Sequence, residues 1–119
     1  MVLGHWPCLA RFGVLLGAIL ATVPPAFAQG SRCLQEATSI RRAESQLPRL
    51  EVAPPGDQQI VCITLETNML FARRLAAHMA HCPRSPLARG ADAWRRTGLQ
   101  YSAQFADRRC KPAIRGYRG

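Results

Sequence analysis

The chain has 119 residues, 48% of them hydrophobic and 7% aromatic, and its 16 basic against 7 acidic side chains give a net charge of +9. This length allows one small domain and is too short for two, and the apolar fraction argues against an intrinsically disordered chain. Nine glycines and nine prolines without a repeat period exclude collagen-like and solenoid architectures.

The first 28 residues have the features of a secretory signal peptide. Arg11 precedes an uncharged apolar run at residues 13–23, two prolines interrupt that run, and Ala-Phe-Ala at 26–28 is a small-x-small cleavage signal. The apolar run is about half as long as the roughly 20 residues that a bilayer span requires, which disfavours an uncleaved membrane anchor. We therefore expect a secreted or periplasmic mature chain that begins at Gln29, of bacterial or eukaryotic origin.

Cysteine usage agrees with export. Removal of Cys8 with the leader leaves an even number of cysteines, which in a short exported chain indicates two disulfides. No CxxC motif is present, which disfavours a zinc knuckle and a thioredoxin-like redox site. We expect no cofactor. The four remaining cysteines are Cys33, Cys62, Cys82 and Cys110.

The first predicted helix covers residues 31–47, with Ser31 as N-cap and Pro48 as terminator. Spacings of four and three residues place a mostly apolar stripe on one face of this helix. The stripe consists of Cys33, Ala37, Ile40, Glu44 and Leu47. A connector at 48–57 follows, in which Pro54-Pro55-Gly56 disfavours regular structure and Asp57 is suited to cap the next helix.

The second predicted helix covers residues 58–81, and Pro83 ends it. One stripe repeats at three- and four-residue spacings, and further apolar residues add a second side, so we expect this helix to be central and to pack against both neighbours. The stripe is Cys62, Leu65, Met69, Ala72, Ala76 and Met79, and the second side is Ile63, Leu70 and Ala77.

The third predicted helix has Ser85 as N-cap, Pro86 at its first position and Arg109 near its end. Its apolar stripe is Leu87, Ala91, Trp94, Gly98, Tyr101 and Phe105. Gly98 allows a close approach to a neighbouring helix. No useful alternating strand pattern occurs, so the sequence predicts an all-α, three-helix up-down-up bundle at residues 29–110, followed by a basic tail at 111–119.

Helix geometry selects the disulfide pairing. A continuous helix separates Cys62 and Cys82 by about 30 Å, far beyond the roughly 7 Å Cα limit of a disulfide. In an up-down-up bundle the start of the first helix lies beside the end of the second, and the start of the second lies beside the end of the third. We therefore predict Cys33–Cys82 and Cys62–Cys110, each worth roughly 4 kcal/mol if it acts through chain entropy.

Positive charge is concentrated near the C-terminus. Residues 84–119 contain eight arginines and one lysine against two aspartates, a net charge of +7. Because arginine favours bidentate contacts with carboxylates and phosphates, we interpret this region as a docking face for an anionic polymer, an anionic membrane surface or an acidic protein. The alternative is a solvated face that reflects codon usage, and nucleic acid is disfavoured because exported proteins rarely meet it. The candidate binding residues are Arg95, Arg96, Arg108, Arg109, Arg115 and Arg118.

His78 and His81 are candidate metal ligands, with Met79 between them. Imidazole and thioether ligands suit copper, and nickel or zinc can also use the two histidines. Periplasmic handling of copper or nickel is therefore the alternative function. The competing interpretation is a pair of partly exposed histidines that favour the helix C-terminus.

An enzyme is the least favoured function, and we expect no catalytic activity. The chain lacks GxSxG, HExxH and glycine-rich phosphate-loop motifs, and no Ser-His-Asp set can be argued from the sequence. Two histidines on one helical turn are also unable to flank a phosphodiester, as a small secreted hydrolase of that type would require.

Overall fold

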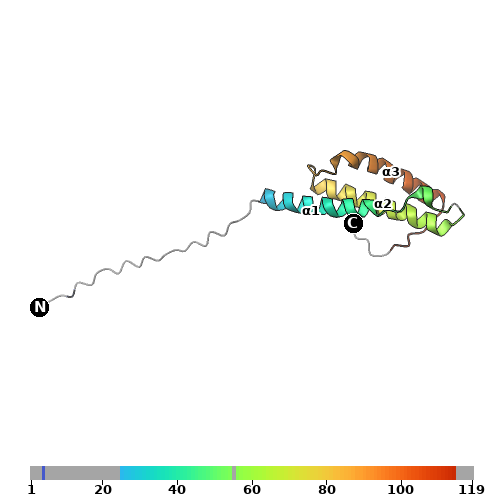
Figure 1. Cartoon of the computed structure of the whole chain (residues 1–119), viewed down its shortest axis with the longest axis horizontal. Helices are drawn as coiled ribbons and strands as arrows, with labels where there is room; N and C mark the ends of the chain where they lie inside the picture. Colours follow the sequence, from blue (N-terminus) through green and yellow to red (C-terminus); the bar gives the residue numbers. More distant parts are fainter. Residues whose placement is uncertain (1–3, 5–24, 55, 115–119) are drawn as a thin grey trace.

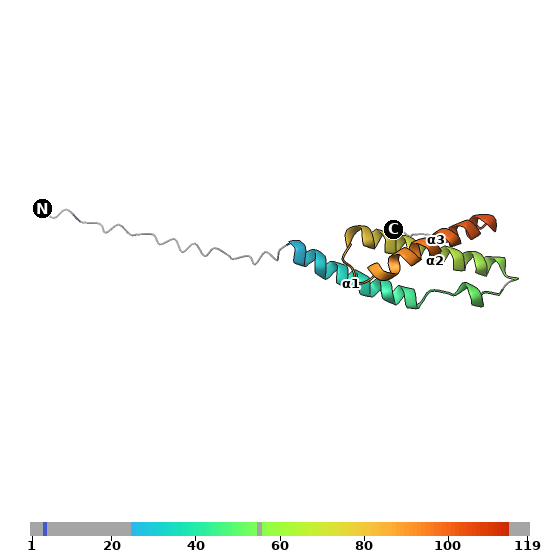
Figure 2. The same cartoon turned by 90° about the horizontal axis from the view of Figure 1, so that it is seen from above.

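The computed structural model describes residue 4, residues 25–54 and residues 56–114, and within this part all regular secondary structure is helical, with no strand. Helices α1 (Pro25–Ser45), α2 (Gln58–His81) and α3 (Ala88–Asp107) alternate in direction, with a short 3-10 helix, η1 (Leu50–Val52), in the first connector (Figures 1 and 2). The predicted all-α, up-down-up bundle is confirmed. No helix of the described part is both long and apolar enough to span a membrane; the predicted apolar run at 13–23 lies outside it.

The bounds of α1 differ from the prediction at both ends. The helix begins at Pro25 instead of Ser31, since proline is tolerated in a first turn whose N–H groups have no intrahelical acceptor. It ends at Ser45 instead of Leu47, because residues before a proline avoid the helical region. The Gln46 and Leu47 amides make tighter i,i−3 bonds of 3.1 and 3.2 Å instead. Helix α1 thus crosses the predicted cleavage position after residue 28, which stays a prediction.

Helix α2 has the predicted bounds, and its predicted cap is confirmed. The carboxylate of Asp57 accepts a hydrogen bond of 3.1 Å from the Ile60 amide, satisfying a donor that the first turn leaves free. At the other end the Cys82 amide donates to the carbonyl of His78, before Pro83 prevents continuation.

Helix α3 begins at Ala88, three residues after the predicted cap at Ser85. The hydroxyl of Ser85 does accept a hydrogen bond of 3.2 Å from the Leu87 amide, but Leu87 is the flanking residue of the helix. The C-terminal end has a Schellman arrangement, in which the Cys110 amide donates to the Phe105 carbonyl and the Arg109 amide to that of Ala106. Arg109 takes the left-handed conformation this motif requires, with φ of 55°.

Helix α2 is the central element, as predicted, and packs against both α1 and α3. Within the described part no Cα atom of α1 lies within 8 Å of one of α3, so the outer helices meet through side chains. The principal core lies between α1 and the middle of α2 and includes Ala37, Ile40, Phe71, Leu75 and Leu87. Trp94 closes it from α3, with its ring 4.6 Å from that of Phe71 in an edge-on arrangement.

The predicted second apolar side of α2 is partly wrong. Ile63 is 40% exposed, whereas the side that faces α1 contains Phe71, Leu75 and His78. The prediction failed because it counted only apolar residues, and the buried face of α2 includes polar residues whose hydrogen bonds are satisfied. These are Thr64, Glu66, Asn68 and His78.

Both predicted disulfides are present. Cys33–Cys82 joins the start of α1's apolar stripe to the end of α2, with Cα atoms 5.8 Å apart. Cys62–Cys110 joins the second turn of α2 to the second residue after the C-cap of α3, with Cα atoms 5.5 Å apart. Each closes a loop of nearly 50 residues, so the bundle is tied at both poles.

Candidate functional site

The arginines of α3 project from the side of the helix that α2 does not cover. Arg89 and Arg96 are seven residues apart, which places them on one side of α3, and both are exposed. Asp92 lies among them, with a carboxylate oxygen 3.0 Å from Nη2 of Arg95 and another 3.7 Å from Nη2 of Arg96. All three side chains of these ion pairs are more than 60% exposed, so the pairs contribute little to stability.

A second basic group lies beyond the end of α3. Arg108, Arg109 and Lys111 are exposed, and the carbonyl of Arg108 accepts a hydrogen bond of 2.8 Å from Nε2 of Gln58 at the start of α2. Arg96 and Arg108 are separated by about 18 Å along the helix axis at 1.5 Å per residue. The predicted arginines therefore form two groups. Arg115 and Arg118 lie outside the described residues.

The segment after Cys110 is held against α2 by a buried carboxylate that the sequence patterns did not single out. Glu66 is 5% exposed and accepts hydrogen bonds of 3.0 and 2.9 Å from the Ala113 amide and of 2.6 Å from the Ile114 amide. Glu66 is the sole acidic residue in the sequence of α2, and this was the signal from which its role could have been suspected. This contact holds Ala113 and Ile114 against α2.

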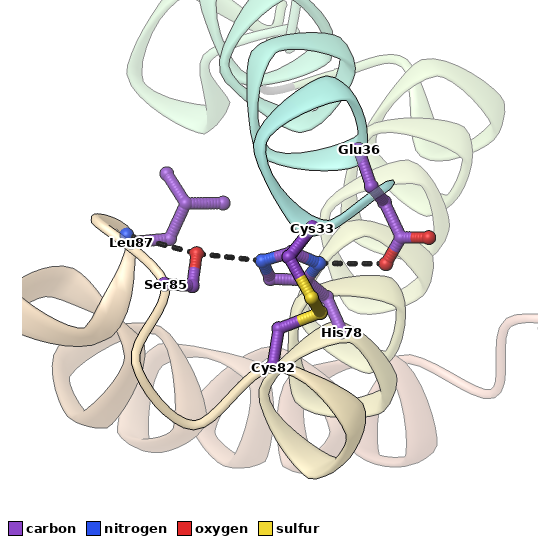
Figure 3. The surroundings of a disulfide bond; sticks show 6 residues. All are labelled: Cys33, Glu36, His78, Cys82, Ser85 and Leu87. Atoms are coloured by element: carbon purple, nitrogen blue, oxygen red, sulfur yellow. Dashed lines mark hydrogen bonds and ion pairs between the residues drawn. A yellow bond between two sulfur atoms is a disulfide. The ribbon is translucent and has the colours of Figure 1, made fainter. Parts of the chain in front are cut away.

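A polar network lies at the other pole, beside the Cys33–Cys82 disulfide (Figure 3). His78 is 1% exposed, and both ring nitrogens have partners. Nδ1 lies 2.6 Å from Oε1 of Glu36 on α1, and Nε2 lies 2.6 Å from Oγ of Ser85 in the α2–α3 connection. His78 thus links three segments of the chain, and the expected partly exposed histidine pair is wrong for this residue.

The protons of the network follow from its donors and acceptors. The Glu36 carboxylate only accepts, so Nδ1 of His78 carries a proton. In the neutral ring Nε2 then accepts from the Ser85 hydroxyl, whose oxygen accepts from the Leu87 amide. This is the acid–imidazole–hydroxyl order of a nucleophilic serine. Ser85 is only 6% exposed, however. Its hydroxyl donates to Nε2 of His78 and accepts from the Leu87 amide, so the network joins α1, α2 and the α2–α3 connection.

The residues proposed as copper or nickel ligands have different environments. Met79 packs against the principal core, and His81 is exposed, whereas His78 is buried with both nitrogens engaged. The donor atoms that do lie together belong to Glu36, His78 and Cys82, all within 4.8 Å of one another. In this structure the sulfur of Cys82 is bonded to Cys33 and is not available as a thiolate.

An open hollow of about 770 Å³ borders this pole of the bundle. Its walls include both cysteines of the Cys33–Cys82 disulfide, together with Ser85, His81 and Arg84. Small reagents and ions from solvent can therefore reach the neighbourhood of the disulfide without opening the core.

Comparisons with known proteins give no relative from which a role could be taken. No family model matches the chain, and neither a curated protein nor a solved structure matches it significantly. The features that can support a function are therefore the two arginine groups of α3 and the polar network around His78.

Proposed function

We propose that the protein is exported, is not an enzyme, and binds an anionic partner through the exposed arginines of α3 and the segment that follows. The observation that carries this proposal is that α3 packs through one side and exposes its arginines on another. Helix α3 packs against α2, and its exposed side and the residues after its end carry an excess of positive over negative charge. Two basic groups about 18 Å apart suit an extended polymer or a surface better than a single small anion.

The ion pairs of Asp92 do not prevent such binding. Arg95 and Arg96 hold this carboxylate through exposed contacts, which are each worth about 0.2–1 kcal/mol and are weakened by salt. A phosphate, sulfate or carboxylate of the partner can replace Asp92 at small cost. Arg108 and Arg109 are presented from a capped and disulfide-anchored helix end, which limits the entropy lost when they bind.

Export is supported by the predicted leader and by the two disulfides, which persist mainly in oxidising compartments. The proposed location is the periplasm or the extracellular space. N-terminal analysis of the protein from its native host is expected to give Gln29 as the first residue. Recovery of a chain that retains residues 13–23 would contradict export by cleavage.

The binding proposal is tested by replacing four arginines at a time with glutamine. The test variant changes Arg95, Arg96, Arg108 and Arg109, and the control variant of equal charge changes Arg32, Arg41, Arg42 and Arg49, which are exposed on α1 and the first connector. We expect the test variant to elute from heparin, and to dissociate from anionic vesicles, at lower salt than the control variant. Equal elution of both variants would contradict the proposal, and the two media separate polymer from membrane binding.

A further inference from the structure

The pole that contains the Cys33–Cys82 disulfide brings together four side chains with the donor types that zinc prefers. Cys33 and Glu36 come from one turn of α1, and His78 and Cys82 come from the last turn of α2 and its flanking residue. The donor atoms of Glu36, His78 and Cys82 are within 4.8 Å of one another, and the Cys33 sulfur is bonded to that of Cys82 (Figure 3).

We propose that reduction of this disulfide turns the pole into a Zn²⁺ site with two thiolates, one imidazole and one carboxylate as ligands. The ligands are Cys33, Cys82, His78 and Glu36. Sulfur, nitrogen and oxygen donors in a tetrahedral set are typical of Zn²⁺. The C-terminal end of α2, at Cys82, adds the negative pole of the helix dipole, which also favours a cation.

The disulfide is what keeps the site closed. Two thiolates bound to one tetrahedral Zn²⁺ stand about 3.8 Å apart, given Zn–S bonds of about 2.3 Å, whereas the disulfide holds the sulfurs at bonding distance. A dithiol reductant breaks the S–S bond by supplying two electrons and two protons, and is itself oxidised to a disulfide. Binding of Zn²⁺ then forms two Zn–S bonds and releases the two thiol protons to solvent.

The network around His78 needs only a small rearrangement to accept the ion. Zn²⁺ takes the place of the proton between Nδ1 of His78 and Oε1 of Glu36, which are 2.6 Å apart. These two atoms need to move apart by less than about 1 Å to stand at the separation of two ligands of one tetrahedral Zn²⁺. The proton of the imidazole then lies on Nε2 and is donated to the Ser85 hydroxyl, 2.6 Å away. Ser85 thereby keeps the ring oriented, as the outer partners of metal-bound histidines do.

The second disulfide provides a matched control within the same chain. In the chain from Gln29, the variant Cys62→Ser/Cys110→Ser retains the proposed site, and Cys33→Ser/Cys82→Ser removes it and leaves Cys62 and Cys110. Each is reduced anaerobically and titrated with Co²⁺, which serves as the spectroscopic probe for Zn²⁺. We expect cobalt–thiolate charge-transfer bands and tetrahedral d–d bands at one Co²⁺ per chain only where the site is retained, with displacement by Zn²⁺ and no bands before reduction.

Two further variants test whether the folded site binds the metal. Ser85→Ala is expected to weaken Co²⁺ binding about 10- to 100-fold, because it removes the partner that orients the imidazole, and His78→Gln is expected to weaken it more. If the serine variants lose helical circular dichroism, the wild-type chain is reduced with all its cysteines intact and compared with Ser85→Ala and His78→Gln made in that same chain. No cobalt–thiolate bands in the retained-site chain, bands of equal strength in a Cys33→Ser/Cys82→Ser variant that keeps its helicity, or affinity insensitive to Ser85 and His78 would overturn the proposal.

Discussion

Gly98 of α3 lies so close to Ala72 of α2 that a Cβ atom on Gly98 would stand 2.8 Å from Cβ of Ala72. The absence of a side chain at this position therefore sets how closely the two helices approach. Gly98→Ala is expected to lower the free energy of unfolding by about 1–2 kcal/mol, because overpacking outweighs the roughly 1 kcal/mol gain in helix propensity.

Gly90 is the matched control for this substitution, since it lies in the same helix and a Cβ atom added to it would have nothing within 4 Å. Gly90→Ala is expected to raise the free energy of unfolding by about 0.5–1 kcal/mol. Denaturant titration of both variants with the disulfides intact tests the pair. Changes of the same sign at the two positions would contradict the close contact at Gly98.

Arg109 is placed in the left-handed conformation at the end of α3. Because this conformation suits glycine, Arg109→Gly is expected to raise the free energy of unfolding by about 0.5–1 kcal/mol while removing one candidate binding residue. The variant is therefore expected to be more stable and to bind heparin more weakly. Lower thermal stability of the variant would contradict this expectation, because it would show that contacts of the Arg109 side chain stabilise the fold by more than its left-handed backbone conformation destabilises it.

The Glu66 carboxylate is expected to determine whether residues 111–114 stay against α2. Glu66→Gln replaces one accepting oxygen by a donor, so at least one bond to the Ala113 or Ile114 amide is lost, at about 1.5–3 kcal/mol for a charged acceptor. Hydrogen exchange resolved by residue is expected to accelerate at these two amides and to change little in the middle of α2. Unchanged exchange at Ala113 and Ile114 would contradict the role of Glu66.

Ser85 provides a test of the non-enzymatic proposal. Its hydroxyl is buried and already bonded within the network, so a fluorophosphonate reagent is expected to leave the intact mass of the protein unchanged. A stoichiometric adduct at Ser85 that disappears in His78→Gln would identify an activated serine and contradict the proposal.

The bundle and both disulfides could be predicted because they depend on regularities along single helices. The spacing of apolar residues identified the inner faces of the helices, and prolines and Asp57 marked helix ends. The rise per residue of a helix excluded a disulfide between Cys62 and Cys82. The start of α1 was not predictable by the same means, since Pro25 is compatible with both a break and a first turn.

The polar contacts of the candidate sites could not be predicted, because each joins residues of different segments. The spacing of residues within one helix does not reveal such contacts. His78 meets Glu36 from α1 and Ser85 from a connection, at sequence separations of 42 and 7. Glu66 binds backbone amides, which no side-chain pattern reveals. The concentration of arginine and its spacing along the third helix were evident from the sequence, but the hydrogen bond that joins the Arg108 carbonyl to Gln58 was not.

The most direct measurement of the central proposal is residue-resolved NMR of the oxidised mature chain during titration with a heparin oligosaccharide. We expect the largest amide shift changes in α3 around Arg89, Arg95 and Arg96 and again at residues 108–114, with both groups decreasing together as salt rises. Shift changes centred on the exposed arginines of α1, or no saturable change at low salt, would contradict binding through α3.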